Sequence, residues 1–224
     1  MKVLILDSGI LINLSMNGLL YILEELKNIT GLKIIITKDV KTETIDRPIG
    51  IPKFELGALR VQNLLNLKII DLPDSIQVSD NQINSLTKEF MELANHSIQS
   101  HNQFIQIVSN AEMSCLALSK ILSDKNIENI IGIDERTTRV ISEKPENLEK
   151  LMSDKLHQKI SINKKKIITF SEFKFIRSSE LIFAAFKKGA IKLKGPKVLE
   201  AALYAVKYHG SSVSFEEIDV LKKL

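Results

Sequence analysis

The chain has 224 residues, of which 44% are hydrophobic and 26% charged, with 9 Gly and 5 Pro; these proportions exclude a disordered, collagen-like or linker sequence. Its only cysteine, Cys115, excludes an intramolecular disulfide and a cysteine-based zinc site and suits a reducing compartment. The longest apolar runs fall far short of the roughly 20 residues that a membrane span needs, and Asp7 interrupts the first of them before any signal-peptide pattern develops. We therefore expect a cytoplasmic protein with no membrane partner.

The net charge of +4 is unevenly distributed along the chain. Residues 1–145 carry 15 Lys+Arg and 18 Asp+Glu, whereas residues 146–224 carry 16 Lys+Arg and 9 Asp+Glu. We interpret residues 1–145 as a core and residues 146–224 as a basic extension that supplies the last strand and the C-terminal helices and packs on the core. A basic extension suits a polyanionic ligand, although 26 Lys against 5 Arg can produce the same asymmetry through composition alone.

Short apolar runs, typical of strands buried on both faces, alternate with segments of helical spacing. In chain order we predict a strand at 2–6, a helix at 18–29, a strand at 33–37, a helix from 39 that breaks at 48–52 and resumes over 54–65, a strand at 67–72, helices at 80–94, 97–108 and 110–122, a strand at 127–133, a helix over 135–151 broken at Pro145, a strand at 173–176, and helices at 179–188, 196–208 and 215–224. Lys164, Lys165 and Lys166 are expected in a loop. This alternation predicts an α/β fold whose parallel sheet is covered by helices on both faces.

Acidic residues fall where the strands end. Asp7 follows the first strand, Glu43 lies one helical turn beyond the second, Asp134 follows the fourth, and Glu112 lies near the start of the preceding helix. Ligands of open parallel sheets bind beyond the carboxyl ends of the strands. Carboxylates that meet there raise one another's pKa unless a cation neutralises them, and Mg²⁺ or Mn²⁺ prefers such oxygen ligands.

The four acids thus predict a divalent-metal site that activates water and stabilises a phosphodiester transition state. The alternative is that some of the 27 acidic residues end strands or cap helices without binding any metal.

The segments around these acids resemble those of PIN-domain nucleases. Val-Leu-Ile-Leu-Asp7-Ser8-Gly-Ile-Leu-Ile-Asn-Leu is similar to the opening of that family, and Lys-Asp-Val-Lys-Thr-Glu43 to the helix that brings its second acid. Ser-Asn-Ala-Glu112 resembles the Gly-Glu-Ala-Glu form of one branch, and Asp134-Glu-Arg-Thr-Thr-Arg139 resembles that branch's Asp-Glu-x-x-x-Arg segment. The order and approximate spacing agree over residues 1–145.

The resemblance implies a three-layer α/β/α sandwich with a five-stranded parallel sheet of order 3-2-1-4-5, and cleavage of RNA by an Mg²⁺- or Mn²⁺-dependent endonuclease. Asp7, Glu43, Glu112 and Asp134 would then hold the metal and carry the catalysis, supported by Ser8. The chain departs from the branch at Asn110, where a second Glu is usual, and at Gly132, where many members have Thr or Ser. With its C-terminal extension the chain is also longer than the compact toxin nucleases of the family.

Further candidates lie around the acids and in the extension. Ser178, Ser179 and Glu180 follow the last strand and either support the acids, as Asn110 would, or cap the next helix. Phenylalanines near residues 170–186 either stack on bases or belong to the core. The candidate RNA contacts are Arg136, Arg139, Lys187, Lys188, Lys192, Lys194 and Lys197.

Two other functions remain open at this point. A PIN-fold module that binds RNA or a protein without cutting would share the fold. A phosphotransfer protein would need a phosphoryl group on Asp7, yet the second Asp of haloacid-dehalogenase-like phosphatases is missing two residues later. Whether the chain forms a homodimer or binds an antitoxin-like protein is likewise left open.

Overall fold

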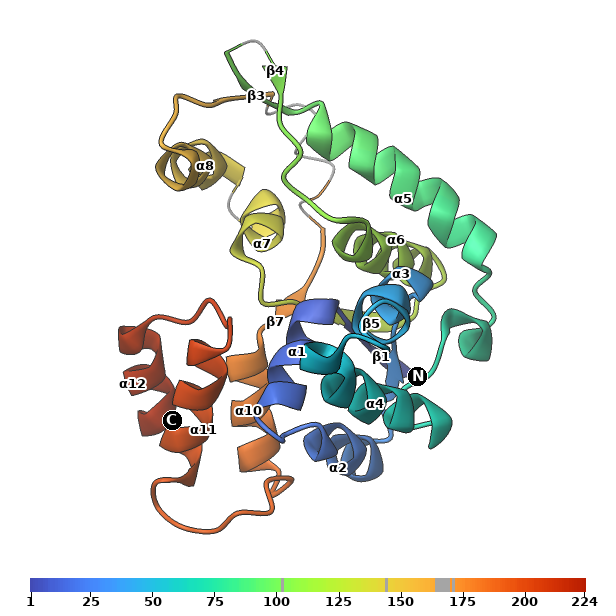
Figure 1. The fold of residues 1–224 in the computed structure, drawn as a ribbon, viewed down its shortest axis with the longest axis vertical. Helices are drawn as coiled ribbons and strands as arrows, with labels where there is room; N and C mark the ends of the chain where they lie inside the picture. The colour runs from blue at the N-terminus through green and yellow to red at the C-terminus, as the bar shows by residue number, and fades with distance from the viewer. Residues whose placement is uncertain (102, 144, 164–169, 171) are drawn as a thin grey trace.

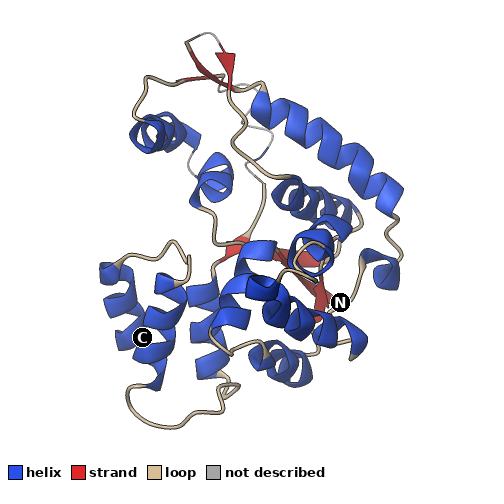
Figure 2. Cartoon of the chain, in the orientation of Figure 1, coloured by secondary structure: helices blue, strands red, loops and turns tan. Residues whose placement is uncertain are grey.

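The computed structural model describes residues 1–101, 103–143, 145–163, 170 and 172–224 and has an α/β fold (Figures 1 and 2). The lysine run 164–166 lies outside the described residues. The strands are β1 (Lys2–Leu6), β2 (Lys33–Ile35), β3 (Ile98–Ser100), β4 (Gln103–Phe104), β5 (Glu128–Gly132), β6 (Ser161–Ile162) and β7 (Phe175–Ile176). The helices are α1 (Ser8–Met16), α2 (Tyr21–Thr30), α3 (Lys38–Lys41), a π-helical turn (Thr42–Asp46), α4 (Pro52–Asn66), α5 (Asp80–Asn95), α6 (Asn110–Asp124), α7 (Arg136–Glu143), α8 (Leu148–Leu156), α10 (Ser178–Lys187), α11 (Val198–Tyr208) and α12 (Phe215–Lys223), with 3₁₀ turns at Pro73–Ile76 and Pro145–Asn147.

A parallel sheet of order β2-β1-β5-β7 forms the centre of the molecule. In its register Leu4 pairs with Ile34 on one side and with Ile130 on the other. The β1 residues from Val3 onward are buried, which agrees with the apolar run that predicted a central strand. The expected α/β class and parallel sheet are confirmed.

The predicted strand at residues 67–72 is wrong. α4 ends at Asn66, and Lys68 then adopts a positive φ of 53°. The N–H of Ile69 donates back to the carbonyl of Leu64 at 2.9 Å. Residues 67–69 therefore form a tight turn after α4 instead of the first half of a strand. Only Asp71 reaches the sheet, as a single parallel bridge to Ile35, and the parallel sheet therefore has four strands where five were expected.

The predicted helix at residues 97–108 is also wrong. This segment contains β3 and β4, which form a small antiparallel sheet with β6. His101 has a positive φ of 48° at the turn between them. In β3, Ile98 and Ser100 are buried and Gln99 between them is partly exposed, and this period of two is that of a strand.

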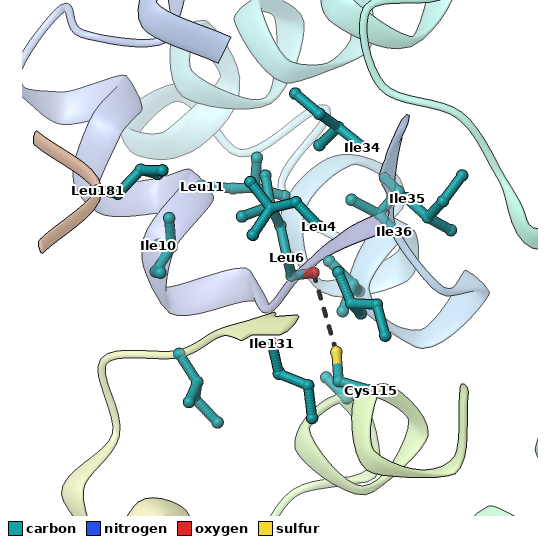
Figure 3. Packing of buried hydrophobic residues seen from close by; sticks show 14 of the residues in the cluster. Leu4, Leu6, Ile10, Leu11, Ile34, Ile35, Ile36, Cys115, Ile131 and Leu181 are labelled. Carbon is teal, nitrogen blue, oxygen red and sulfur yellow. Dashed lines mark hydrogen bonds between the residues drawn. The ribbon is translucent and has the colours of Figure 1, made fainter. Parts of the chain in front are cut away.

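A helix that the sequence analysis missed, α1, begins directly after β1. Asp7 is its N-cap, and the Asp7 side chain accepts a hydrogen bond from the N–H of Gly9. Figure 3 shows Ile10 and Leu11 of α1 near Leu6, with Cys115 of α6 on another side of the strand. The Cys115 thiol lies 3.8 Å from the Leu6 carbonyl oxygen and is buried, as expected for a core residue.

The C-terminal segment continues the sheet and then adds three helices. β7 pairs with β5 through Ile131 and Phe175, α10 contacts α1, and α11 packs between α10 and α12 (Figure 1). The apolar faces of these helices are buried, with Leu181 on α10, Leu203 on α11 and Ile218 on α12 in the core. Within the described part of the chain, no helix is long and apolar enough to cross a membrane.

Candidate functional site

Asp7 ends β1 in a buried position. Its N–H donates to the carbonyl of Gly132 at 2.9 Å, and its Oδ2 accepts from the N–H of Gly9 at 3.1 Å. Its Oδ1 is buried and has no hydrogen-bond partner among the described residues. Burial, together with the charges of Glu112 and Glu43, raises the pKa of Asp7 to about 7. The metal-free site therefore favours the protonated form of this carboxyl group more than water does.

Glu43 approaches Asp7 from the π-helical turn that follows β2 and α3. The Ser8 hydroxyl donates to Glu43 Oε2 at 2.8 Å, so the residue beside Asp7 holds the second acid. The charge of Glu43 raises the pKa of both Asp7 and Glu112. The supporting role predicted for Ser8 agrees with this contact.

Glu112 approaches from the first turn of α6, where it forms a capping box with Ser109. Its Oε2 accepts from the Ser109 N–H at 3.2 Å and from the Thr138 hydroxyl at 2.7 Å. Burial raises the pKa of Glu112, an effect that the hydrogen bonds from Thr138 and Ser109 oppose. Thr138, on α7, is thus a contact of the acidic site that the sequence analysis missed.

Asp134 has a different environment from the other three acids. Its Oδ1 accepts from the Ser178 N–H at 2.9 Å and from the Ser178 hydroxyl at 3.0 Å, while its Oδ2 accepts from Asn13 Nδ2 at 3.2 Å. Asn13 also donates to the Val206 carbonyl at 2.9 Å. Asp134 therefore connects α1, α10 and α11, and both of its oxygens are already satisfied by protein donors.

The structure thus brings Asp7, Glu43 and Glu112 within electrostatic range of one another and binds Asp134 to α10. No group of three or more His, Cys, Asp or Glu among the described residues is arranged to hold a metal ion. The unpartnered Oδ1 of Asp7 beside two carboxylates fits one hard cation, because Mg²⁺ is often bound by one or two carboxylates together with water and substrate phosphates. Asp134 accepts hydrogen bonds from three protein donors, and its role as a metal ligand stays a prediction.

The predicted supporting residues have different surroundings in the structure. Ser178 bonds Asp134, as its position after the last strand predicted, whereas Glu180 accepts hydrogen bonds from Arg177. Ser179 is buried and Asn110 is exposed on the first turn of α6.

The candidate RNA contacts of the extension are exposed. These are Lys187, Lys188, Lys192, Lys194 and Lys197. Lys187 donates to the Leu224 carbonyl, and Lys192 lies 3.4 Å from the Glu25 carboxylate. Phe170, a candidate for base stacking, is fully buried and packs edge-on against Phe90. Arg136 is exposed, whereas the side chain of Arg139 is mostly buried.

Asn13, the partner of Asp134 that the sequence analysis missed, lies 121 residues away in the chain, yet it carried a usable signal. It lies among the buried apolar residues of α1, between Ile10 and Leu14. A buried amide requires hydrogen-bond partners, so an Asn in that pattern indicates a polar connection inside the fold.

Compared with models of protein families, with curated proteins and with solved structures, the chain shows no match.

Proposed function

We propose that Asp7, Glu43 and Glu112 form the site of a divalent-metal-dependent ribonuclease of the PIN type. The observation that carries the proposal is the buried Asp7 carboxylate, whose Oδ1 has no partner among the described residues and whose pKa is raised to about 7 by burial and by its two acidic neighbours. A cation bound at this oxygen would restore the ionised form, because it supplies the positive charge that the buried carboxylate lacks.

Each residue of this site would have its own role. Asp7 presents Oδ1 to the ion, Ser8 holds Glu43, and Ser109 and Thr138 hold Glu112. A bound Mg²⁺ or Mn²⁺ supplies a water of lowered pKa and stabilises charge on the phosphate. Asp134, one of the four predicted ligands, acts instead as a positioning residue that fixes α10 against α1.

A relationship to PIN domains is supported by the placement of the acids after β1, after β2 and on the helix before β5. We propose the three-layer sandwich and the order 3-2-1-4-5 on the same basis, with the bridge at Asp71 in the position of the third strand. Gly132 is a departure with a structural reason, since a Cβ there would lie 2.8 Å from Leu6 Cδ2 and 3.0 Å from Ile10 Cδ1. The hydroxyl missing at Gly132 has a counterpart in Thr138 beside Glu112.

The test compares wild type with Asp7→Asn, and uses Asp124→Asn as the matched control because Asp124 is an exposed partner of Lys120. Mn²⁺ binding is followed by calorimetry, and cleavage by gel analysis of single-stranded and structured RNA. We expect Asp7→Asn to lose both, and Asp124→Asn to keep both. Cleavage that persists in Asp7→Asn contradicts the proposal.

A second candidate is the module that binds RNA without cutting it. It is favoured by the lack of any metal-holding group of three side chains among the described residues and by the satisfied carboxylate of Asp134. RNA binding by wild type that is unaffected by Asp7→Asn and unaccompanied by Mn²⁺-dependent turnover would select this candidate over the nuclease.

A further inference from the structure

A cavity of about 610 Å³ lies between α7, the start of α10, the end of α11, and α12 with the segment before it. Four cationic side chains line it against three carboxylates, those of Glu143, Glu180 and Glu217. The cations are Arg136, Arg139, Arg177 and Lys207. Figure 1 shows α7 in yellow and α10 to α12 in orange to red, so one helix before β7 and the three helices after it surround the cavity.

Arg177 forms ion pairs with two of the three carboxylates that line this cavity. Its Nη2 and Nε donate to Glu180 Oε1 at 2.7 and 3.1 Å, and its Nη1 donates to both carboxylate oxygens of Glu217 at 2.9 and 3.0 Å. The Arg177 side chain is only 11% exposed. These contacts make it a fixed part of the wall whose charge is already balanced.

Arg139 is much less compensated. Its side chain is 12% exposed, and its nearest carboxylate oxygen, on Glu143, is 3.9 Å away. Its Nη2 donates to the Ser212 hydroxyl at 2.8 Å, while its Nε is buried with no hydrogen-bond partner in the described part of the chain. Burial and the neighbouring charge of Arg177 lower the pKa of Arg139. An anion bound in the cavity would balance the charge of Arg139 and accept a hydrogen bond from its guanidinium group.

Ser211 is a second residue of this cavity with a buried polar atom that has no hydrogen-bond partner among the described residues. The residue lines the cavity and is 5% exposed, and that atom is its buried hydroxyl oxygen. Buried hydroxyl groups nearly always find a partner in proteins. With Arg139 Nε, the Ser211 hydroxyl provides a second unused donor in the same cavity.

The cavity is connected to the acidic site through two elements. On α7, Thr138 bonds Glu112 and the next residue, Arg139, lines the cavity. At the start of α10, Arg177 lines the cavity and the next residue, Ser178, bonds Asp134. A strand lying over the acids would therefore bring its backbone close to the unused donors.

We propose that this cavity binds a backbone phosphate of the RNA strand, at a position next to the phosphate that is cleaved; this inference rests on the proposed ribonuclease function. A guanidinium edge and a hydroxyl are donors suited to a tetrahedral oxyanion, and arginine binds phosphate with charge-assisted hydrogen bonds. The contact positions the strand and takes no part in activating water.

The test measures binding in EDTA, where metal-dependent cleavage is suppressed. The variants are Arg139→Gln, Ser211→Asp, which puts a carboxylate into the cavity, and Arg60→Gln as a control that removes the same charge on α4. The probes are inorganic phosphate and a single-stranded uridine oligonucleotide. Urea unfolding of each variant checks that it is folded.

We expect Arg139→Gln and Ser211→Asp to weaken oligonucleotide binding roughly 10- to 100-fold, the range for a lost charge-assisted contact. In Arg139→Gln the slope of log affinity against log salt should become shallower by about 0.7, the value for one phosphate contact on a single strand. Arg60→Gln should bind the oligonucleotide like wild type.

Three results would overturn the inference: wild type that binds neither probe, unchanged oligonucleotide affinity in both cavity variants, or a loss of phosphate binding alone, which would mark a site for a free anion. The outcome is separable from that of the ribonuclease proposal, because binding in EDTA does not require turnover. Cleavage that depends on Asp7 while the cavity variants bind normally would refute the cavity contact and leave the ribonuclease standing.

Discussion

Replacing Asp7 with Asn should change how the stability of the metal-free protein depends on pH. The folded protein raises the pKa of this carboxyl group from 3.8 to about 7. Between these values the folded state holds a proton that the unfolded state has released, so the free energy of unfolding of wild type should fall as the pH rises. Asn cannot ionise, and the variant should lack this part of the decline.

The size of the effect follows from the shift. Three pKa units at about 1.36 kcal/mol each correspond to about 4 kcal/mol lost between about pH 4 and pH 7. The amide N–H₂ of Asn would take the place of a buried oxygen that has no hydrogen-bond partner among the described residues, which costs about 1 kcal/mol or more. We therefore expect Asp7→Asn to be more stable than wild type by about 2 to 3 kcal/mol at pH 8, and equal or slightly less stable near pH 4.

The measurement is urea unfolding in EDTA across this pH range, with Asp124→Asn as the exposed control that should follow the wild-type curve. In Glu112→Gln the decline due to Asp7 should be smaller and end at a lower pH, because one of the charges that raise the pKa of Asp7 in the folded state is gone. Parallel pH curves for wild type and Asp7→Asn would refute the argument, since Asp7 would then have the same pKa in both states.

Three substitutions test the packing and hydrogen bonds around the acids by urea unfolding. Gly132→Ser should cost about 1 to 3 kcal/mol, because its Cβ would collide with side chains of β1 and α1; an unchanged midpoint would show that these side chains can move aside. Thr138→Val should cost about 1 to 2 kcal/mol at pH 8 and less near pH 4, because the lost hydroxyl bonds the ionised Glu112; equal losses at both pH values would contradict a bond to the ionised form. Ser178→Ala should cost about 1 to 3 kcal/mol by leaving Asp134 short of a donor; the cost should vanish in an Asp134→Ala background, which removes the acceptor, and an undiminished cost there would contradict the argument.

Local patterns in the sequence determined much of the framework. The apolar run at residues 2–6 predicted β1 with its observed bounds, and Gly31, which has a positive φ of 66°, ends α2 as expected. Ser109 predicted the start of α6, whose capping box holds Glu112. These signals operate within one turn or one strand, where backbone conformation and burial depend on neighbours in the chain. They were sufficient to predict that Asp7, Glu43 and Glu112 follow or precede strands of one parallel sheet.

Only the tertiary structure decided what each acid contacts. Asp134 follows its strand as Asp7 does, yet Asn13 and Ser178, 121 and 44 residues away in the chain, satisfy its oxygens. Among the described residues Asp7 Oδ1 has no such donor, so the two carboxylates differ in their hydrogen bonding although their local sequence patterns are alike. The unused donors of Arg139 likewise depend on where α10 and α12 pack. Hydrogen bonding and desolvation of a side chain depend on residues brought together by packing, and no pattern confined to the flanking residues records them.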